Sequence, residues 1–472
     1  MTGDILDNDL IAQYQQARLS RDRRFDGTFF VAVKSTGIFC RPVCPARLPA
    51  EKNVRYYHLA AQAMHAGFRP CLRCRPDSAP HSSAWKGVNT TVQRATALLS
   101  ELPVQPISAV AERLGISPRY LHKLITEKFG ISPRLWQQYH QLMFAKQLLQ
   151  GTILPVEQVA ISAGFGSARR LQVAMKKYWG LTPSQVRGKK QAEGALTPSF
   201  TVFLAYRPPY HWPFVRDFLA ARALPGTEQV SDDSYQRVFC HGHWQGKVTA
   251  KHMPSAGGFS VTVYINGLTG AKWIMDNLSR VLDLHADPTL INQALIAAGI
   301  PAKDVCSGLR LPGVWSAFEA GCRAVLGQQV SVKAAIALVT KLTDALGKHT
   351  EHGIAFPEPG AVANSALVFL KMPESRKHAL RNLAHYFVQR QDATTPLSHQ
   401  EADILALKGI GPWTLDYLLM RGESHPDRYL GGDLIIKKMA QQHGVNPHAA
   451  APWRSYLTLQ MWHMANQQKD KR

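Results

Sequence analysis

The sequence lacks the features of a membrane-spanning or exported protein. Its 472 residues contain no run of about 18 apolar residues, the length that a helix needs to cross a bilayer. The first residues, Met1 to Asp9, are acidic and lack the basic and apolar regions of a signal peptide. We therefore expect a cytoplasmic protein with no membrane partner. A chain of this length should fold into three or more domains.

Acidic residues are also scarce. The chain has 33 Asp and Glu against 55 Lys and Arg, so its formal net charge is +22. This positive charge is unevenly distributed along the chain. Residues 81–190 contain 15 Lys and Arg but only 4 Asp and Glu, so they carry a net charge of 15 − 4 = +11, half of the total. A basic segment of this kind usually binds nucleic acid, so we expect DNA as the partner.

Cysteines are few, and four of the seven are clustered near the N-terminus. They form two close pairs whose spacing matches a tetrahedral zinc site: Cys40, Cys44, Cys71 and Cys74. Such a site can be purely structural, since zinc contributes folding energy to small domains. The remaining three are expected to be small buried apolar residues: Cys240, Cys306 and Cys322.

The basic segment contains two similar helical blocks, 107–125 and 156–178. In each, apolar residues recur at helical spacing up to a glycine, and a serine then starts a second helix. Ser117 and Ser167 are the expected N-caps of these second helices. The doubled pattern is typical of helix–turn–helix DNA binding, although an unspecific helical bundle is the alternative. Basic residues of the second helices are the candidate DNA contacts: Arg119, Lys123, Arg169, Arg170 and Lys176.

The next segment has strand periodicity. Residues 200–204, 246–250 and 259–265 alternate between apolar and polar side chains, and a helix is expected around residues 212–222. No cluster of catalytic residue types is present there.

The C-terminal part is mostly helical, and one hairpin is prominent in it. Gly409 and Gly411 can adopt positive φ and expose backbone N–H groups, and Pro412 suits the first turn of a helix. Such a helix N-terminus can bind a DNA phosphate. Asp433 then precedes another apolar, helical segment. An ordinary helix–helix turn, with Asp433 as a simple N-cap, is the alternative.

Several stretches resemble known families. Residues 36–47 and 66–74 resemble the zinc domain of Ada, the bacterial methylation-response regulator, and the doubled helical blocks resemble the AraC-type DNA-binding domain. Residues 208–212 and 218–222, the hairpin and Asp433 resemble the AlkA-type 3-methyladenine DNA glycosylase II of the helix–hairpin–helix superfamily. The resemblance implies a multidomain α+β protein with a small zinc domain, an all-α double helix–turn–helix domain, an α/β TBP-like subdomain and an all-α helix–hairpin–helix glycosylase domain. Their expected bounds are 1–80, 85–188, 197–285 and 286–470.

The Ada resemblance implies that Cys40 takes a methyl group from a methyl phosphotriester in DNA. Zinc keeps a bound thiolate nucleophilic at neutral pH, and four thiolates on Zn²⁺ carry a formal charge of minus two. Methylation halves this charge, so nearby arginines should then bind DNA more tightly. The arginines concerned are Arg41, Arg47, Arg69, Arg73 and Arg75.

The AlkA resemblance implies that the enzyme bends the duplex and flips the damaged base into a pocket. Asp433 would stabilise the developing sugar cation. Aromatic rings would stack on the cationic base, although core packing is their alternative role. These rings belong to Trp413, Tyr417, Trp462 and Phe218. Gln329 stands where the family has a leucine wedge. The hairpin resemblance further implies a monovalent cation on the carbonyls near Leu405, Leu407 and Ile410.

Several absences restrict the activity. Trp413 and Thr414 follow Pro412 where glycosylase–lyases of the superfamily carry a lysine, so we expect a monofunctional hydrolase. No cysteine follows Cys322, which excludes an iron–sulfur cluster in this part. The Pro-Cys-His-Arg motif of the alkylguanine methyltransferase domain is missing as well.

The expected partners are promoter DNA, double-stranded DNA with alkylated bases and methyl phosphotriesters, and RNA polymerase, with the protein itself a monomer. The alternative function is a transcriptional activator whose glycosylase half clamps DNA but is weakly active.

Overall fold

The computed structural model describes residues 8–21, 29–44, 46–57, 62–63, 66–71, 74, 88–102, 104–188, 199–390 and 396–470. The chain divides into two compact units, which are described separately: residues 1–100 with 105–136, and residues 101–104 with 137–472. None of the helices described is both long and apolar enough to cross a membrane.

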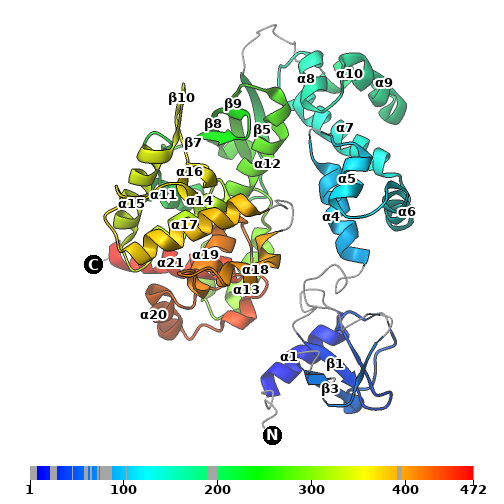
Figure 1. The fold of residues 1–472 in the computed structure, drawn as a ribbon, viewed down its shortest axis with the longest axis vertical. Coiled ribbons are helices and arrows are strands. Elements are labelled where there is room, and N and C mark those ends of the chain that lie inside the picture. Colours follow the sequence, from blue (N-terminus) through cyan, green and yellow to red (C-terminus); the bar gives the residue numbers. More distant parts are fainter. Residues whose placement is uncertain are drawn as a thin grey trace. The chain divides into compact units, whose positions relative to one another are not determined.

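The first unit begins with the cysteine-containing domain. Helix α1 (Asn8–Leu19) accompanies a four-stranded sheet of order β3-β1-β2-β4 (Figure 1). Its strands are β1 (Phe30–Val33), β2 (Ile38–Cys40), β3 (Val54–Tyr57) and β4 (Arg69–Pro70). The rings of Tyr14 and Phe29 stack with centroids 4.0 Å apart, which anchors α1 by aromatic packing.

The first helix–turn–helix block completes this unit. Its helices are α4 (Val88–Ser100), α5 (Ile107–Arg113) and α6 (Pro118–Phe129). Gly115 has a φ of +66° in the turn between α5 and α6, a conformation that favours glycine. The Ser117 hydroxyl accepts the Tyr120 N–H at 3.1 Å, so the predicted N-cap is confirmed.

The second block repeats this design. Its helices are α8 (Val156–Ser162), α9 (Ala168–Trp179) and α10 (Pro183–Arg187), and α7 (Pro133–Gly151) connects the two blocks. Gly164 has a φ of +75°, and the Ser167 hydroxyl accepts the Arg170 N–H at 3.3 Å. The doubled pattern predicted from the sequence is therefore present.

An antiparallel five-stranded sheet of order β5-β9-β8-β7-β6 follows. Its strands are β5 (Ser199–Ala205), β6 (Glu228–Val230), β7 (Ser234–His241), β8 (Trp244–Met253) and β9 (Gly258–Ile265). All three predicted strands lie in it, and the predicted helix is α11 (Trp212–Ala220). One face is apolar, with Val202, Val248 and Val261 fully buried.

The remaining chain is helical apart from a short hairpin. The elements are α12 (Ala271–Val281), α13 (Pro288–Ala297), α14 (Ala317–Leu326), α15 (Val332–Leu346), β10 (Lys348–Thr350), β11 (Gly353–Ala355), α16 (Pro359–Ala363), α17 (Glu374–Gln389), α18 (Glu401–Leu405), α19 (Pro412–Gly422), α20 (Leu434–His443) and α21 (Arg454–Asp470). Helix α14 is the centre of this part, because it packs against α15, α17 and α19 (Figure 1). The expected multidomain α+β fold is confirmed.

The burial of the three scattered cysteines is predicted correctly only in part. Cys306 and Cys322 are 7% and 0% exposed. Cys240 is only half-buried, and its Sγ accepts the Lys348 Nζ at 3.4 Å. The prediction for Cys240 is wrong because the residue lies near the end of β7, where the strand approaches the surface.

Candidate functional site

The four clustered cysteines converge on one point. Parallel pairing aligns Phe39 of β2 with Pro70 of β4, which brings Cys40 and Cys71 side by side. The four Sγ atoms all lie within 4.8 Å of one another. Tetrahedral zinc with bonds of about 2.3 Å needs sulfur–sulfur separations of under about 4 Å, so a small contraction would complete the site. These residues fit Zn²⁺.

The ionisation of these thiols is strongly coupled. Hydrogen bonds from Cys40 and Cys74 lower the pKa of Cys44 to about 2. Hydrogen bonding to Cys44 and Cys74 raises the pKa of Cys40 well above its usual range. Four thiolates this close repel one another, and a divalent cation bound to all four would remove that penalty.

The cysteines differ in exposure. Cys40 is only partly buried, whereas Cys44, Cys71 and Cys74 are 7–9% exposed. A reactant from solution would therefore reach Cys40 first. Arg47 and Arg69 are exposed nearby in sequence. Arg41 differs from the expectation that it faces DNA, because it is 8% exposed and donates to the Cys74 carbonyl at 3.3 Å. Arg73 and Arg75 lie outside the described residues.

The predicted DNA contacts of the helix–turn–helix blocks occupy the second helix of each block. Arg119 and Lys123 lie on α6, and Arg169, Arg170 and Lys176 lie on α9. All five side chains are exposed. Their roles on DNA stay predictions.

The hairpin between α18 and α19 begins with a glycine that no other residue could replace without strain. Gly409 has a φ of +94°, and a Cβ there would lie 2.5 Å from the Cβ of Ala379. Gly411 differs from the expectation of positive φ, because its φ is −105° as the N-cap of α19. Within the described residues, the N–H groups of Gly409 and Gly411 donate to no backbone carbonyl. Both can therefore donate to a phosphate.

A second loop is fixed to this hairpin. The Gln328 side chain donates to the Gly409 carbonyl and to the Thr414 hydroxyl, both at 3.0 Å. The adjacent Gln329 is exposed and has a φ of +58°, which a non-glycine residue rarely adopts. This anchored turn presents Gln329 to solvent, and its role as a wedge stays a prediction.

Asp433 is the N-cap of α20. Its Oδ1 accepts the N–H groups of Ile435 and Ile436 at 2.9 and 3.1 Å. Its Oδ2 has no hydrogen-bond partner among the residues described, and the side chain is partly exposed. The N-cap role that was the alternative for Asp433 is therefore present, and one carboxylate oxygen remains available, so its catalytic role stays a prediction. A Cβ added to the preceding Gly432 would lie 3.8 Å from the Trp413 ring, so this loop adjoins α19.

The predicted pocket aromatics form two pairs. Trp413 and Tyr417 stack with centroids 5.5 Å apart, and Phe218 and Trp462 stack at 6.3 Å. The Arg421 guanidinium connects the pairs, at 4.6 Å from the Phe218 centroid and 5.7 Å from the Tyr417 centroid. Trp413, Tyr417 and Trp462 keep partly exposed surfaces, whereas Phe218 is 8% exposed.

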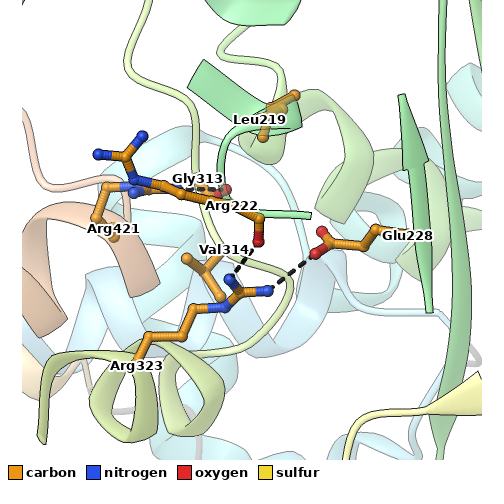
Figure 2. A pocket seen from close by; sticks show the side chains of 7 residues that line it. All are labelled: Leu219, Arg222, Glu228, Gly313, Val314, Arg323 and Arg421. Carbon is orange, nitrogen blue, oxygen red and sulfur yellow. Dashed lines mark hydrogen bonds and ion pairs between the residues drawn. The ribbon is translucent and has the colours of Figure 1, made fainter. Parts of the chain in front are cut away.

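A charged network that the sequence reasoning missed lies behind these rings. A small pocket is lined by Leu219, Arg222, Glu228, Gly313, Val314, Arg323 and Arg421 (Figure 2). In it, Arg323 donates to Glu228 and to the Arg222 carbonyl, at 2.9 and 2.8 Å. The signal available in the sequence was Glu319 and Arg323, an i,i+4 pair of opposite charge inside the otherwise apolar α14.

The chain matches known families along most of its length. Residues 13–77 match the metal binding domain of Ada, residues 110–189 match a helix-turn-helix domain, and residues 201–316 match the AlkA N-terminal domain.

Full-length relatives agree with these matches. The chain is 34% identical over 470 residues to the probable bifunctional transcriptional activator/DNA repair enzyme AlkA of Mycobacterium tuberculosis, a match that covers 94% of both chains. It is 34% identical to DNA-3-methyladenine glycosylase 2 of Escherichia coli, covering 57% of this chain and 99% of the relative. The bifunctional transcriptional activator/DNA repair enzyme Ada of Escherichia coli is 35% identical, covering 37% of this chain and 48% of the relative. This chain therefore belongs to the family of bifunctional transcriptional activator/DNA repair proteins in which Ada-type zinc and helix-turn-helix domains precede an AlkA-type glycosylase.

Proposed function

We propose that the chain releases alkylated bases from DNA by hydrolysing the N-glycosidic bond. We also propose that Cys40 accepts a methyl group from methyl phosphotriesters in the DNA backbone. The observation that carries the first part is the free Oδ2 of Asp433, in a loop whose preceding residue, Gly432, adjoins the Trp413 ring. A carboxylate there would stabilise the sugar cation that forms when a base departs. The hairpin N–H groups and the exposed Gln329 would hold the bent duplex.

The rings of Trp413, Tyr417 and Trp462 would bind the flipped base, with Phe218 supporting them. An alkylated purine is cationic, so stacking on electron-rich rings is favourable. Water attacks C1′ of the sugar, the electron pair of the broken bond leaves with the base, and the water's proton is released. A lysine is missing after the hairpin, so we propose a monofunctional enzyme that leaves an abasic site.

The test is release of 3-methyladenine and 7-methylguanine from alkylated DNA. Asp433→Asn keeps an acceptor for the α20 N–H groups but removes the charge, so release should fall about 100- to 1000-fold. Asp276→Asn, which changes an exposed acid on α12, is the matched control and should release both bases normally. Equal release by the Asp433→Asn variant and the unaltered protein would contradict the proposal. Cleavage of the DNA strand, together with a covalent protein–DNA adduct formed when borohydride reduces a Schiff base, would show a lyase instead.

For Cys40, zinc would keep the sulfur ionised at neutral pH. The Sγ attacks the methyl carbon of the phosphotriester, the methyl–oxygen bond breaks, and the phosphate leaves as an ordinary diester anion. Mass spectrometry of the protein after incubation with methylated DNA should find one added methyl group. The group should be absent in Cys40→Ala, and its retention there would contradict the assignment.

The remaining parts of the proposal concern partners. We propose that α6 and α9 bind promoter DNA through their exposed basic residues and that the protein contacts RNA polymerase as a monomer in the cytoplasm, where such DNA lies. A monovalent cation on the hairpin carbonyls is part of the same proposal, and replacing potassium by a bulky organic cation should then weaken DNA binding. An activator with a weakly active glycosylase half is the second candidate, because the helix–turn–helix blocks are complete.

A further inference from the structure

The charged network behind the aromatic rings has more guanidinium groups than carboxylates. Arg237 pairs with Glu228 at 2.9 Å and with Glu319 at 2.5 Å. Arg323 pairs with the same two carboxylates at 2.9 and 2.8 Å. These two arginines and two glutamates therefore neutralise one another.

Arg222 and Arg421 have no such partner. Among the residues described, neither forms an ion pair with a carboxylate. Arg421 is 2% exposed, and it donates to the Pro312 carbonyl at 2.5 Å and to the Tyr417 hydroxyl at 3.2 Å. Arg222 is partly exposed, and it donates to the Phe218 carbonyl at 3.3 Å. Arg421 also donates to the Gly313 carbonyl at 3.5 Å, and Arg222 is hydrogen-bonded to the Tyr417 side chain. Both guanidinium groups lie against the Phe218 ring, at 3.8 Å from its centroid for Arg222 and 4.6 Å for Arg421.

Both groups remain charged at neutral pH. Burial lowers the pKa of Arg222 to about 10 and also lowers that of Arg421. A partly buried charge without a counter-ion is unfavourable, so two of them side by side indicate a role other than stability. The arrangement suits negative charge that forms close by during a reaction.

Tyr417 is the group through which the positive charges of Arg222 and Arg421 would act on a bound base. Its ring stacks on Trp413 in the proposed base pocket. Its oxygen accepts a hydrogen bond from Arg421, so the hydroxyl hydrogen can be donated elsewhere. Burial would raise the pKa of Tyr417, but the positive charges of Arg421, Arg222 and Arg323 outweigh burial and lower it. A phenol polarised in this way is a stronger hydrogen-bond donor.

We propose that Arg222 and Arg421 act through Tyr417 as a leaving-group site, in which the Tyr417 hydroxyl donates a hydrogen bond to the departing base. The proposal rests on the proposed glycosylase function. When the bond to C1′ breaks, its electron pair moves onto the base nitrogen; water adds hydroxyl to C1′, and a solvent proton finally neutralises the base. The hydroxyl stabilises the base between these steps by donating its hydrogen bond, and the two guanidinium groups stabilise the partial negative charge that this donation leaves on the Tyr417 oxygen.

The benefit depends on the charge of the base. A cationic alkylated purine becomes neutral when it leaves and needs little assistance. A neutral damaged purine, such as hypoxanthine, becomes an anion and needs a donor. The site therefore extends excision to neutral bases, and its contribution should appear as a difference between the two substrate types.

The test compares single-turnover release of hypoxanthine with release of 7-methylguanine. Tyr417→Phe removes one oxygen and keeps the ring, and it should slow hypoxanthine release at least about 10-fold more than 7-methylguanine release. Arg222→Met should change the ratio in the same direction. Arg280→Met is the matched control, because Arg280 also lacks a carboxylate partner among the described residues but bonds only to Asn277, Ser424 and the carbonyls of Val314, Trp315 and Gly422. It should leave the ratio unchanged.

Equal slowing of both substrates in Tyr417→Phe would overturn the proposal, because it would indicate a purely structural hydroxyl. Release of 7-methylguanine without any release of hypoxanthine by the unaltered protein would also overturn it. Failure of the proposed function has a different signature, namely that Asp433→Asn and the unaltered protein release 7-methylguanine equally.

Discussion

Gly409 is the residue whose backbone most clearly defines the hairpin. Gly409→Ala would force a side chain into positive φ and against Ala379, so we expect a loss of about 1–3 kcal/mol in the free energy of unfolding. Gly411→Ala is the matched control, because its φ is negative and no atom lies within 4 Å of the added Cβ. It should cost under about 1 kcal/mol. Urea unfolding followed by tryptophan fluorescence measures both, and equal effects would contradict the argument.

Glu319 is the fully buried carboxylate of the network, at 0% exposure. Glu319→Ala would leave Arg237 and Arg323 short of a counter-charge inside the protein, so we expect a loss of about 3–5 kcal/mol in stability. The exposed pair Lys251–Asp233 provides the comparison, and Asp233→Ala should destabilise the protein far less than Glu319→Ala, because water screens an exposed ion pair. Thermal unfolding of the two variants at the same ionic strength distinguishes the cases.

Sequence reasoning at this scale succeeded where a residue type has a local role. Ser117 and Ser167 were predicted as caps, and a cap was the alternative role for Asp433, because capping depends on the next three residues only. The Arg237–Glu319 pair joins residues 82 positions apart, and no local pattern marks it. The burial of Arg41 was missed for the same reason, since its partner Cys74 is 33 residues away.

The segment between α19 and α20 is the element that carries Asp433, and its geometry depends on His425. The Nδ1 of His425 accepts the Asp427 N–H at 3.1 Å, and its carbonyl accepts the Ser455 hydroxyl at 2.7 Å. Burial and the charge of Arg428 lower the pKa of His425 to about 4. The neutral ring is therefore the form that the folded protein requires.

The lowered pKa of His425 makes the free energy of unfolding depend on pH. Between pH 6.5 and about 4, the unfolded chain binds a proton that folded His425 does not, so stability falls as the pH falls. We expect His425 to account for about 1–3 kcal/mol of this loss, after allowance for its partial exposure. His425→Gln should reduce the difference between urea midpoints at pH 7 and pH 5. His378→Gln, on the exposed side of α17, should leave that difference unchanged.

Elements were predictable where periodicity was strong. The strands of the five-stranded sheet alternate in burial, as their sequences indicated. Helix α14 ends at Leu326, and the anchored turn with Gln329 in positive φ follows it. That turn is set by the contact of Gln328 with Gly409, 81 residues away, so the sequence could suggest a wedge position but not its conformation.

At the scale of the whole molecule, one chain joins an Ada-type zinc domain, a helix–turn–helix domain and an AlkA-type glycosylase. Half of its excess positive charge lies in residues 81–190. The family and the order of the domains were predictable from motifs, whereas the domain bounds stay predictions. All of these domains are expected to bind DNA, which is a polyanion, so the charge of each domain should influence the DNA affinity of the whole protein. A charge change at the zinc site should therefore be measurable in the DNA affinity of the complete protein.

Methylation of Cys40 changes the formal charge of a zinc–tetrathiolate site from minus two to minus one. We expect the methylated protein to bind DNA more tightly, with a slope of log affinity against log salt that is steeper by up to about one. Cys40→Ala supplies a matched control, because three thiolates on zinc also carry minus one. With its zinc content verified by native mass spectrometry, this variant should bind DNA like the methylated protein without any exposure to damage. If it binds like the unmethylated protein instead, the gain in affinity comes from the methyl group itself and not from the lost charge.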